Sequence, residues 1–398
     1  MCRVFHIISH FDMGGAERVA ANLAMAPGVE AHVVEIMRGR SSFTHGFISE
    51  LTAAGVHIHR AWMPDIRWHF VVERLTALLF PLRFLFTFLR YRPQVVHAHT
   101  EGPDMCVVWF FTLFPRLRKR VRIVRTIHNT RLWTGQQRIG RKVERFYQRH
   151  AANIAISQSV LQAYKAWGTA DAIIYNGVPE VAQQPYPHLV PGKINVIFSG
   201  RFEPQKGIDT LIAVIERVAQ MDEFQRRVVT VQVHFDREKR QTVATPGQAQ
   251  SIQEEGCPYH FHLFGAGSLR EKIVAKLGGL PCVSIRPPLG QLAKQLGSFS
   301  YMFMPSQFEG LSIVAIEASM ARLPNIINDA PGLAETLPPD WPLKVQGNSV
   351  DDYVRLFTEV IPTADKFLLG QQAHAYAVSH FSLQAMQEGY AGIGDVHP

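Results

Sequence analysis

Two successive series of short apolar segments, each followed by a polar or glycine-rich loop and then a helix-like segment, run along this sequence. Such alternation of strands and helices predicts parallel sheets covered by helices. Ligands bind these sheets at the carboxyl ends of the strands, so functional residues are expected directly after strands. The strands predicted in the first half are 3–9, Val33–Met37, Gln94–His99, Arg122–Ile127, Asn153–Ser157 and Ala172–Tyr175.

The second half repeats the theme after a segment rich in proline and poor in periodicity, which predicts a linker over residues 181–192. The expected architecture is α/β, with two tandem Rossmann-like, doubly wound domains that face a central cleft. The domains are predicted over residues 1–180 and 193–375, and residues 376–398 are predicted to form a C-terminal helix that packs back toward the first domain. The strands predicted in the second half are Asn195–Ser199, His260–Phe264, Tyr301–Met304 and Pro324–Asn328.

Composition agrees with a large globular protein. The chain has 398 residues, of which 47% are hydrophobic and 19% charged, enough for two domains with substantial cores. The four cysteines are scattered without Cys-x-x-Cys spacing, which indicates reduced thiols and argues against a disulfide framework or a cysteine-based zinc site. The first apolar segment is too short for the core of a signal peptide and is expected to be a strand.

Charge is divided unevenly between the halves. Residues 1–190 carry a net charge of +11 and residues 191–398 a net charge of −3, which together give the +8 of the whole chain. A basic half joined to a slightly acidic half suggests that the two face different partners.

Two carboxylates, Glu309 and Glu317, flank the start of a helix predicted after the buried strand Tyr301–Met304. A helix N-terminus after such a strand presents free backbone N–H groups to an anionic ligand. Glu309 is expected in the loop, facing the ligand, and Glu317 about two turns into the helix. Carboxylates beside a phosphate-binding loop are explained if the ligand also carries hydroxyl groups, which carboxylates accept well.

Two basic side chains follow the first strand of the second half. Arg201 and Lys206 lie beside Gly200 and Gly207, which favours a role in binding anions over a solvated basic loop. Farther on, Gly265-Ala266-Gly267 lacks a third glycine, because Arg270 stands at that position, so it is weak evidence for a dinucleotide site. We interpret Gly265 as part of a tight turn beside a nucleotide base.

In these segments the chain resembles the large family of retaining glycosyltransferases with the GT-B fold, family 4 or glycosyl transferases group 1, which includes many bacterial surface-polysaccharide enzymes. The resemblance covers nearly the whole chain. The matching landmarks are Gly14-Gly15-Ala16-Glu17, Asn176-Gly177-Val178, Phe198-Ser199-Gly200-Arg201 with Lys206-Gly207, Glu309 with Glu317, Gly332-Leu333-Ala334-Glu335 and His380-Phe381-Ser382.

The resemblance implies roles for individual residues. Arg201 and Lys206 would hold the donor diphosphate, Glu309 the hydroxyls of the donor sugar, and Glu317 the ribose. In the first domain, His128 would lie near the donor sugar and the reaction centre. For His99 a functional role and an ordinary histidine remain equally open. The other implied substrate-binding residues are Gly14 and Gly15 near the phosphate and acceptor, and Gly310, Leu311 and Ser312 after Glu309.

The sequence contains no Asp-x-Asp pair of the kind that metal-dependent transferases commonly use. We therefore expect no metal site and no cofactor, with Arg201, Lys206 and helix N-termini stabilising the diphosphate. The expected co-substrate is a nucleotide sugar, UDP-linked in preference to GDP-linked. Two features depart from the family pattern: Arg322 stands where a glycine is usual, and residues 236–258 are predicted to be a lengthened polar loop without an assigned function.

Other functions remain open. The same fold could serve a nucleotide-sugar epimerase or hydrolase, or a catalytically silent nucleotide-sugar-binding partner in a glycan assembly complex. A dehydrogenase is disfavoured because the full Gly-x-Gly-x-x-Gly motif is missing. Replacing Glu309 or Lys206 would separate an enzyme from a silent binder.

Two stretches of the basic half are both apolar and basic: Trp68–Tyr91, and Met105–Pro115 with the cluster that follows it up to Arg125. The longest uncharged run within Trp68–Tyr91 is far below the ~20 residues needed to span a bilayer, but aromatic and basic residues together suit an anionic membrane surface. The alternative is that the apolar faces pack in the domain core. Nucleic acid is not expected as a partner, because no such binding motif occurs. We expect a cytoplasmic enzyme, peripheral on the inner face of the cytoplasmic membrane, with a glycan or lipid-linked acceptor.

Overall fold

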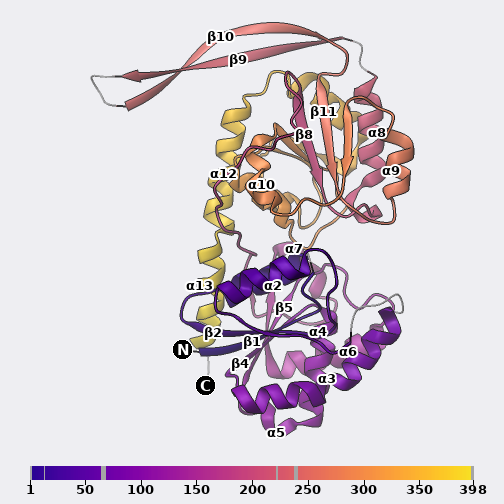
Figure 1. The fold of residues 1–398 in the computed structure, drawn as a ribbon, viewed down its shortest axis with the longest axis vertical. Coiled ribbons are helices and arrows are strands. Elements are labelled where there is room, and N and C mark those ends of the chain that lie inside the picture. The colour runs from indigo at the N-terminus through magenta and orange to yellow at the C-terminus, as the bar shows by residue number, and fades with distance from the viewer. Residues whose placement is uncertain (1, 13, 64–68, 221–222, 237–240, 396–398) are drawn as a thin grey trace. The chain divides into compact units, whose positions relative to one another are not determined.

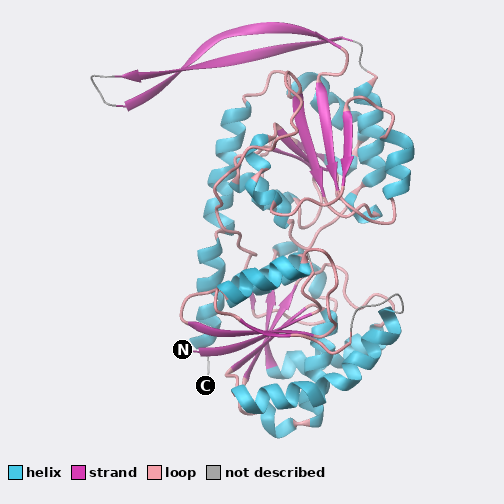
Figure 2. Cartoon of the chain, in the orientation of Figure 1, coloured by secondary structure: helices cyan, strands magenta, loops and turns pink. Residues whose placement is uncertain are grey.

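The computed structural model describes residues 2–12, 14–63, 69–220, 223–236 and 241–395 (Figure 1). The chain divides into two compact units: unit 1 comprises Met1–Pro179 together with His380–Pro398, and unit 2 comprises Glu180–Ser379. Each unit is built around a parallel sheet with helices packed against it (Figure 2). The predicted class, α/β with two doubly wound domains, is confirmed.

Seven strands form the sheet of unit 1, in the order β3-β2-β1-β4-β5-β6-β7, and all neighbouring strands are parallel. The strand order reverses beside β1, which pairs with β2 on one side and β4 on the other. Such a switch point is the usual ligand site of an open parallel sheet. The strands are β1 (Cys2–Ile8), β2 (Val29–Glu35), β3 (His57–His59), β4 (Val95–His99), β5 (Arg122–Ile127), β6 (Ala151–Ala155) and β7 (Ala172–Ile173).

Helices connect these strands and cover the sheet, so its central strands are almost fully buried and largely apolar. The strand β5 has the predicted bounds. The strand β3 was not predicted, because three residues, two of them histidine, make no recognisable apolar pattern. The helices of unit 1 are α1 (Gly15–Ala24), α2 (Thr44–Ala53), α3 (His69–Tyr91), α4 (Glu101–Leu113), α5 (Pro115–Arg118), α6 (Gln137–His150), α7 (Gln158–Tyr164) and α13 (Leu383–Asp395).

The C-terminal helix α13 packs on unit 1. The N–H of Val178 donates to the carbonyl of Phe381 (3.0 Å), and the N–H of Leu383 donates to the carbonyl of Val178 (3.2 Å). Farther along α13, the hydroxyl of Tyr390 lies 2.7 Å from Oγ1 of Thr126 on β5. The end of the chain thus contributes a polar side chain to the buried interior of unit 1.

Six parallel strands form the main sheet of unit 2, in the order β12-β11-β8-β13-β14-β15. The strand order reverses beside β8, which lies between β11 and β13. The strands are β8 (Ile194–Ser199), β11 (Tyr259–Phe264), β12 (Val283–Arg286), β13 (Tyr301–Met304), β14 (Asn325–Asn328) and β15 (Lys344–Val345). The helices are α8 (Ile208–Ala219), α9 (Arg270–Leu277), α10 (Ile313–Met320), α11 (Val350–Arg355) and α12 (Lys366–Phe381).

Residues 181–192, predicted as a linker, pack against unit 2. Tyr186 is 5% exposed and belongs to the core of this unit. The N–H of Tyr186 donates to Oγ of Ser298 (2.9 Å), and the N–H of Gln184 donates to the carbonyl of Lys294 (2.6 Å). The prolines disfavour helix and strand in this segment. The side chain of Tyr186 nevertheless anchors the segment to the core of unit 2.

The segment predicted as a polar loop over residues 236–258 belongs to a long antiparallel hairpin, so that prediction was wrong. Strand β9 (Glu223–Asp236) pairs with β10 (Gln241–Glu255), with a register shift between Pro246 and Ala249; residues 237–240 lie outside the described part of the chain. Apolar and polar residues alternate over Val229–Phe235, as in a strand. The sequence of β10 has no such alternation. This segment is a strand because it pairs with β9.

Arg322 follows α10 with a left-handed backbone (φ +57°) and an exposed side chain. Glycine adopts this conformation without a steric cost, whereas another residue pays about 1–2 kcal/mol. The loop therefore keeps the geometry that a glycine favours, with an arginine in its place.

Arg125, on β5, lies 1% exposed between two carboxylates. Its Nε donates to Oδ2 of Asp104 (2.7 Å), and its terminal nitrogens donate to both oxygens of Glu144 (2.6 and 2.9 Å). Burial opposes the ionisation of Glu144, but the hydrogen bond from Arg125 keeps its pKa lowered. Burial raises the pKa of Asp104 to about 7. The Oδ1 of Asp104 is buried without a hydrogen-bond partner among the described residues.

The helix α3 carries apolar side chains on two faces, and only one of these faces packs in the core. Membrane binding by this stretch stays a prediction, and Arg67 and Trp68 lie outside the described residues. One face carries the buried residues Phe80, Phe84 and Phe88, of which Phe84 and Phe88 pack with Phe110 of α4. The other face leaves large apolar side chains in contact with solvent. We call these exposed residues of α3 and α4 the α3–α4 surface: Leu78, Leu79, Leu82, Phe86, Leu89, Trp109 and Leu113.

Candidate active site

The loops that carry the predicted donor residues gather at the carboxyl edge of the unit 2 sheet. They follow β11, β8, β13 and β14, which are neighbours in that order. Backbone hydrogen bonds join the loops: the N–H of Phe202 donates to the carbonyl of Ala266 (2.8 Å), and the N–H of Gln307 donates to the carbonyl of Gln205 (2.8 Å). Side chains from distant parts of the sequence are thereby held at one edge of the sheet.

Lys206 and Glu309 form an ion pair within this group of loops. The Nζ of Lys206 lies 2.6 Å from Oε1 of Glu309, and the two side chains are 14% and 9% exposed. The backbone N–H of Glu309 donates to the carbonyl of Pro331 (2.8 Å). A partly buried cation held by a positioned carboxylate is a fixed charge at which an anionic ligand can bind.

Two glycines allow the loops to approach so closely. Gly207 (φ +67°) and Gly332 (φ +71°) both have left-handed backbones. A Cβ on Gly207 would overlap the carbonyl of Pro305, and one on Gly332 would overlap the carbonyl of Glu309. The loops that hold Lys206 and Glu309 can therefore meet only where these two positions lack a side chain.

Arg201 is an exposed residue at the same edge, and its Nη2 lies 3.2 Å from Oε1 of Gln205. The amide of Gln205 in turn donates to the carbonyl of Phe308 (3.1 Å), next to Glu309. The sequence did not single out Gln205, yet this side chain connects Arg201 to the loop that carries Glu309. The sequence feature that could have indicated Gln205 is its position four residues after Arg201.

The remaining predicted residues of unit 2 lie at the same edge. Gly265 directly follows β11, and its N–H donates to the carbonyl of Arg286 (3.1 Å). Leu311 and Ser312 are buried after Gly310, and the N–H of Ser312 donates to the carbonyl of Gly332 (3.0 Å). Ser312 is the N-cap of α10, but its hydroxyl makes no capping hydrogen bond.

Glu317 is half-buried within α10. This helix begins at Ile313, so Glu317 lies about one turn into it, and the prediction of two turns was wrong. The buried residues Leu311 and Ser312 belong to the loop rather than to the helix, which is why the helix starts later than the sequence suggested.

In unit 1, the predicted residues lie after β1 and β5. Gly14 is the N-cap of α1 and Gly15 its first residue. The side chain of Glu17 lies against Gly14 and is 8% exposed, and burial raises the pKa of its carboxyl group. The sequence indicated Glu17 only as part of the Gly14-Gly15-Ala16-Glu17 motif. In the structure its buried carboxyl group lies beside this loop.

His128 follows β5 and is 8% exposed. Burial lowers its pKa to about 3, so the imidazole is neutral near pH 7 and serves as a hydrogen-bonding group rather than a cation. Its Nε2 lies 3.4 Å from Nδ1 of His99. The structure thus joins His128 to the residue whose role the sequence left open.

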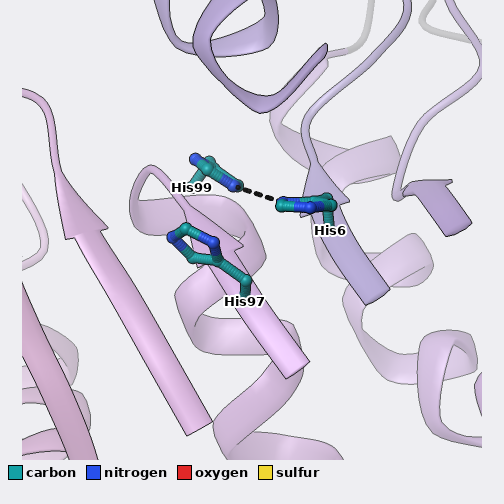
Figure 3. A group of neighbouring side chains, drawn as sticks. All are labelled: His6, His97 and His99. Atoms are coloured by element: carbon teal, nitrogen blue, oxygen red, sulfur yellow. Dashed lines mark hydrogen bonds between the residues drawn. The ribbon is translucent and has the colours of Figure 1, made fainter. Parts of the chain in front are cut away.

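Two further histidines, His6 on β1 and His97 on β4, lie beside His99 (Figure 3). Nδ1 of His6 is 3.2 Å from Nε2 of His99. His6 and His97 were not predicted from the sequence as site residues. The available signal was the His-Ala-His spacing in a strand, which directs two side chains to one face.

Two family models match this chain. Residues 13–180 match Glycosyltransferase Family 4, and residues 225–361 match Glycosyl transferases group 1. A D-inositol 3-phosphate glycosyltransferase of Streptomyces scabiei is 29% identical over 188 residues, which are 46% of this chain and 37% of that protein. The matches to the first curated relatives span less than two thirds of the length of those proteins.

Solved structures show the same fold. HepE of Anabaena, in complex with UDP-glucose, has a TM-score of 0.72 at 14% identity, with 100% of both chains covered. The lipopolysaccharide outer core galactosyltransferase WaaB has a TM-score of 0.60 at 16% identity, with 99% of both chains covered. The chain therefore has the GT-B glycosyltransferase fold, and its N- and C-terminal parts match the models of Glycosyltransferase Family 4 and of Glycosyl transferases group 1.

Proposed function

We propose that this chain is a retaining, metal-independent glycosyltransferase that moves a hexose-type sugar from a nucleotide sugar to a glycan or lipid-linked acceptor. The observation that carries the proposal is the Lys206–Glu309 ion pair, held with Arg201 at the carboxyl edge of the unit 2 sheet. Two basic side chains there suit a diphosphate, and the carboxylates of Glu309 and Glu317 suit hydroxyl groups of the sugar and ribose.

In the proposed reaction, the bond between the anomeric carbon and the diphosphate oxygen breaks, and its electron pair stays with the diphosphate. Arg201 and Lys206 stabilise this developing charge. The acceptor hydroxyl oxygen bonds to the anomeric carbon from the same face, and its proton passes to the leaving phosphate. Glu309 is engaged by Lys206 at 2.6 Å, which supports a binding role rather than that of a free nucleophile.

The proposed donor is a UDP-sugar in preference to a GDP-sugar. Support comes from the likeness in fold to HepE, whose structure contains UDP-glucose. Surface polysaccharide or lipopolysaccharide synthesis is the proposed pathway, and the likeness to WaaB supports an acceptor of this class. No cofactor is part of the proposal.

The proposed location is cytoplasmic, on the inner face of the cytoplasmic membrane. Within the described part of the chain, none of the helices combines the length and apolar content needed to cross a bilayer. The α3–α4 surface instead offers exposed apolar side chains, with Leu82 and Phe86 65% and 73% exposed. Exposed basic residues on or close to these helices match anionic headgroups: Arg90, Arg92, Arg116, Lys119 and Arg120.

The first test is thermal unfolding of the full chain with UDP, GDP, NAD and UDP- or GDP-sugars, each in fixed excess. A ligand that binds only the folded chain raises the unfolding midpoint by mass action. We expect UDP and one UDP-sugar to raise it, Lys206→Ala to abolish the effect, and Lys272→Ala to retain it, because Lys272 forms only an exposed ion pair with Asp209. Stabilisation by NAD alone, or by none of these ligands, would refute the proposal.

Product analysis separates the remaining alternatives. A transferase forms a new glycosidic bond, and NMR of its anomeric proton reports retention of configuration. An epimerase or hydrolase consumes the nucleotide sugar without any acceptor, and a silent binder leaves it unchanged. Turnover after thorough chelation of divalent ions tests the metal-independent mechanism.

A further inference from the structure

Three histidines project from the same face of the unit 1 sheet. His97 and His99 are two residues apart on β4, so their side chains leave the strand on one side. His6 is the register partner of His97 on the neighbouring strand β1. Parallel pairing therefore brings the three imidazoles together, as Figure 3 shows.

The nitrogens of this cluster lie close enough together to be candidate ligands of a single ion. One ring nitrogen from each of the three histidines lies within 4.8 Å of the other two. The closest pair is Nδ1 of His6 and Nε2 of His99, at 3.2 Å. Zinc–nitrogen bonds of about 2.0–2.1 Å place two ligand nitrogens at most about 4.2 Å apart, and the pair formed by His6 and His99 meets this limit.

The other nitrogens of two of these rings already have partners that fix the rings. Nε2 of His97 lies 2.7 Å from Oγ1 of Thr126, which is 2.7 Å from the hydroxyl of Tyr390. Nδ1 of His99 faces Nε2 of His128. Metal-binding histidines commonly have such a hydrogen bond on the nitrogen that does not bind the metal.

Burial keeps the three imidazoles of the cluster in the neutral form. The three side chains are 1–3% exposed. Burial lowers the pKa of all three, that of His6 to about 3, so the rings are neutral near pH 7. Neutral imidazole is the form that binds a metal, and no proton has to be displaced.

We propose that His6, His97 and His99 bind one divalent transition-metal ion of the zinc class. The ligand atoms are Nδ1 of His6, Nδ1 of His97 and Nε2 of His99. Three imidazoles suit zinc, cobalt, nickel or copper and leave a fourth position open. The ion holds the three rings in one orientation, and no step of the proposed transfer reaction runs through it. This site is distinct from the diphosphate residues of unit 2, and the inference does not rest on the proposed transfer reaction.

The test is a titration of tag-free, chelator-treated full-length protein with Co²⁺, followed by displacement with Zn²⁺. We expect one equivalent of Co²⁺ with the visible absorption of a low-coordinate site, and an unfolding midpoint raised by Zn²⁺. His97→Gln and His99→Gln should weaken binding at least about 100-fold, since even loss of a supporting hydrogen bond costs 10–100-fold.

A second cluster provides the matched control. Glu30, His32 and His57 form the other group with metal-ligand spacing among the described residues, and His57→Gln disrupts it while leaving the proposed site intact. Thr126→Val, nearly the same shape as the wild type, should weaken Co²⁺ binding about 10–100-fold without removing a ligand. The proposal is overturned if the wild-type chain binds no equivalent of Co²⁺ or Zn²⁺, or if His57→Gln removes the binding.

Discussion

Nζ of Lys206 lies 2.6 Å from Oε1 of Glu309, although 103 residues separate the two along the chain. Lys206 ends a short 3₁₀ turn after β8, and Glu309 lies in the loop after the adjacent strand β13. The pair therefore joins the two loops that the proposed donor diphosphate and sugar would contact.

Replacing Lys206 alone should lower the free energy of unfolding more than replacing Lys206 and Glu309 together. Lys206→Met leaves the Glu309 carboxylate, 9% exposed, without its cation, and we expect about 1–3 kcal/mol lower unfolding free energy. The double variant Lys206→Met/Glu309→Gln should recover part of this loss, because no unpaired charge remains. Urea unfolding measures both values.

Turnover should fall about 10²–10³-fold in the single lysine variant. Wild-type turnover in Lys206→Met would exclude the lysine from catalysis.

Alanine at Gly332 should be more damaging than alanine at Gly192. Both glycines have left-handed backbones (φ +71° and +77°), so each substitution carries a backbone cost of about 1–2 kcal/mol. Only at Gly332 does the new Cβ overlap a neighbour, the carbonyl of Glu309, whereas the space at Gly192 is open. Thermal unfolding should show a clearly larger loss for Gly332→Ala. Equal losses would mean that the loop relaxes freely.

Asp104 should make the stability of unit 1 pH-dependent between about pH 4 and pH 7. Burial raises its pKa to about 7 in the folded chain, against the ordinary value of 3.8. The folded state thus binds more protons than the unfolded state in this window, so stability falls as pH rises. Relative to Asp104→Asn, the wild-type unfolding midpoint should fall from pH 4 to pH 7. An unchanged difference between the two would contradict the raised pKa.

The α3–α4 surface should bind anionic vesicles. Inserting a large apolar side chain is worth about 1.5–3 kcal/mol, so Leu82→Ser/Phe86→Ser should weaken binding to phosphatidylglycerol vesicles more than 10-fold. The matched control is Phe367→Ser/Leu368→Ser, at positions of unit 2 that are 69% and 53% exposed. Cosedimentation measures the binding, which should weaken as salt is added. Equal effects of the two pairs would argue against this surface.

Glycine at position 322 should stabilise unit 2 slightly. Arg322→Gly relieves the left-handed strain at φ +57° but adds freedom to the unfolded chain, so we expect a gain of up to about 1 kcal/mol. Urea unfolding checks it. A loss of stability would show that the arginine side chain contributes a contact that outweighs the strain.

Local pattern was enough to predict much of the fold. The predicted strands Arg122–Ile127 and Tyr301–Met304 have the bounds of β5 and β13. The second is an uninterrupted run of large nonpolar and aromatic residues, as expected of a strand buried in a parallel sheet. Since polar residues after such strands gather at one edge, Arg201, Lys206 and Glu309 could be assigned to the unit 2 site in advance. Helix starts were less predictable, as Glu317 shows, because a loop buried like Leu311 and Ser312 resembles a helix in composition.

The sequence by itself determined which segments become strands and helices, and which polar residues follow them. Only the tertiary structure decided which distant residues meet: Lys206 with Glu309, and His6 with His97 and His99. It also decided that α3 exposes Leu82 and Phe86 while burying Phe84. The physical reason is that periodicity reports the backbone and its apolar faces locally. Strand order and register bring separated residues together, and many cooperating contacts across each sheet set them.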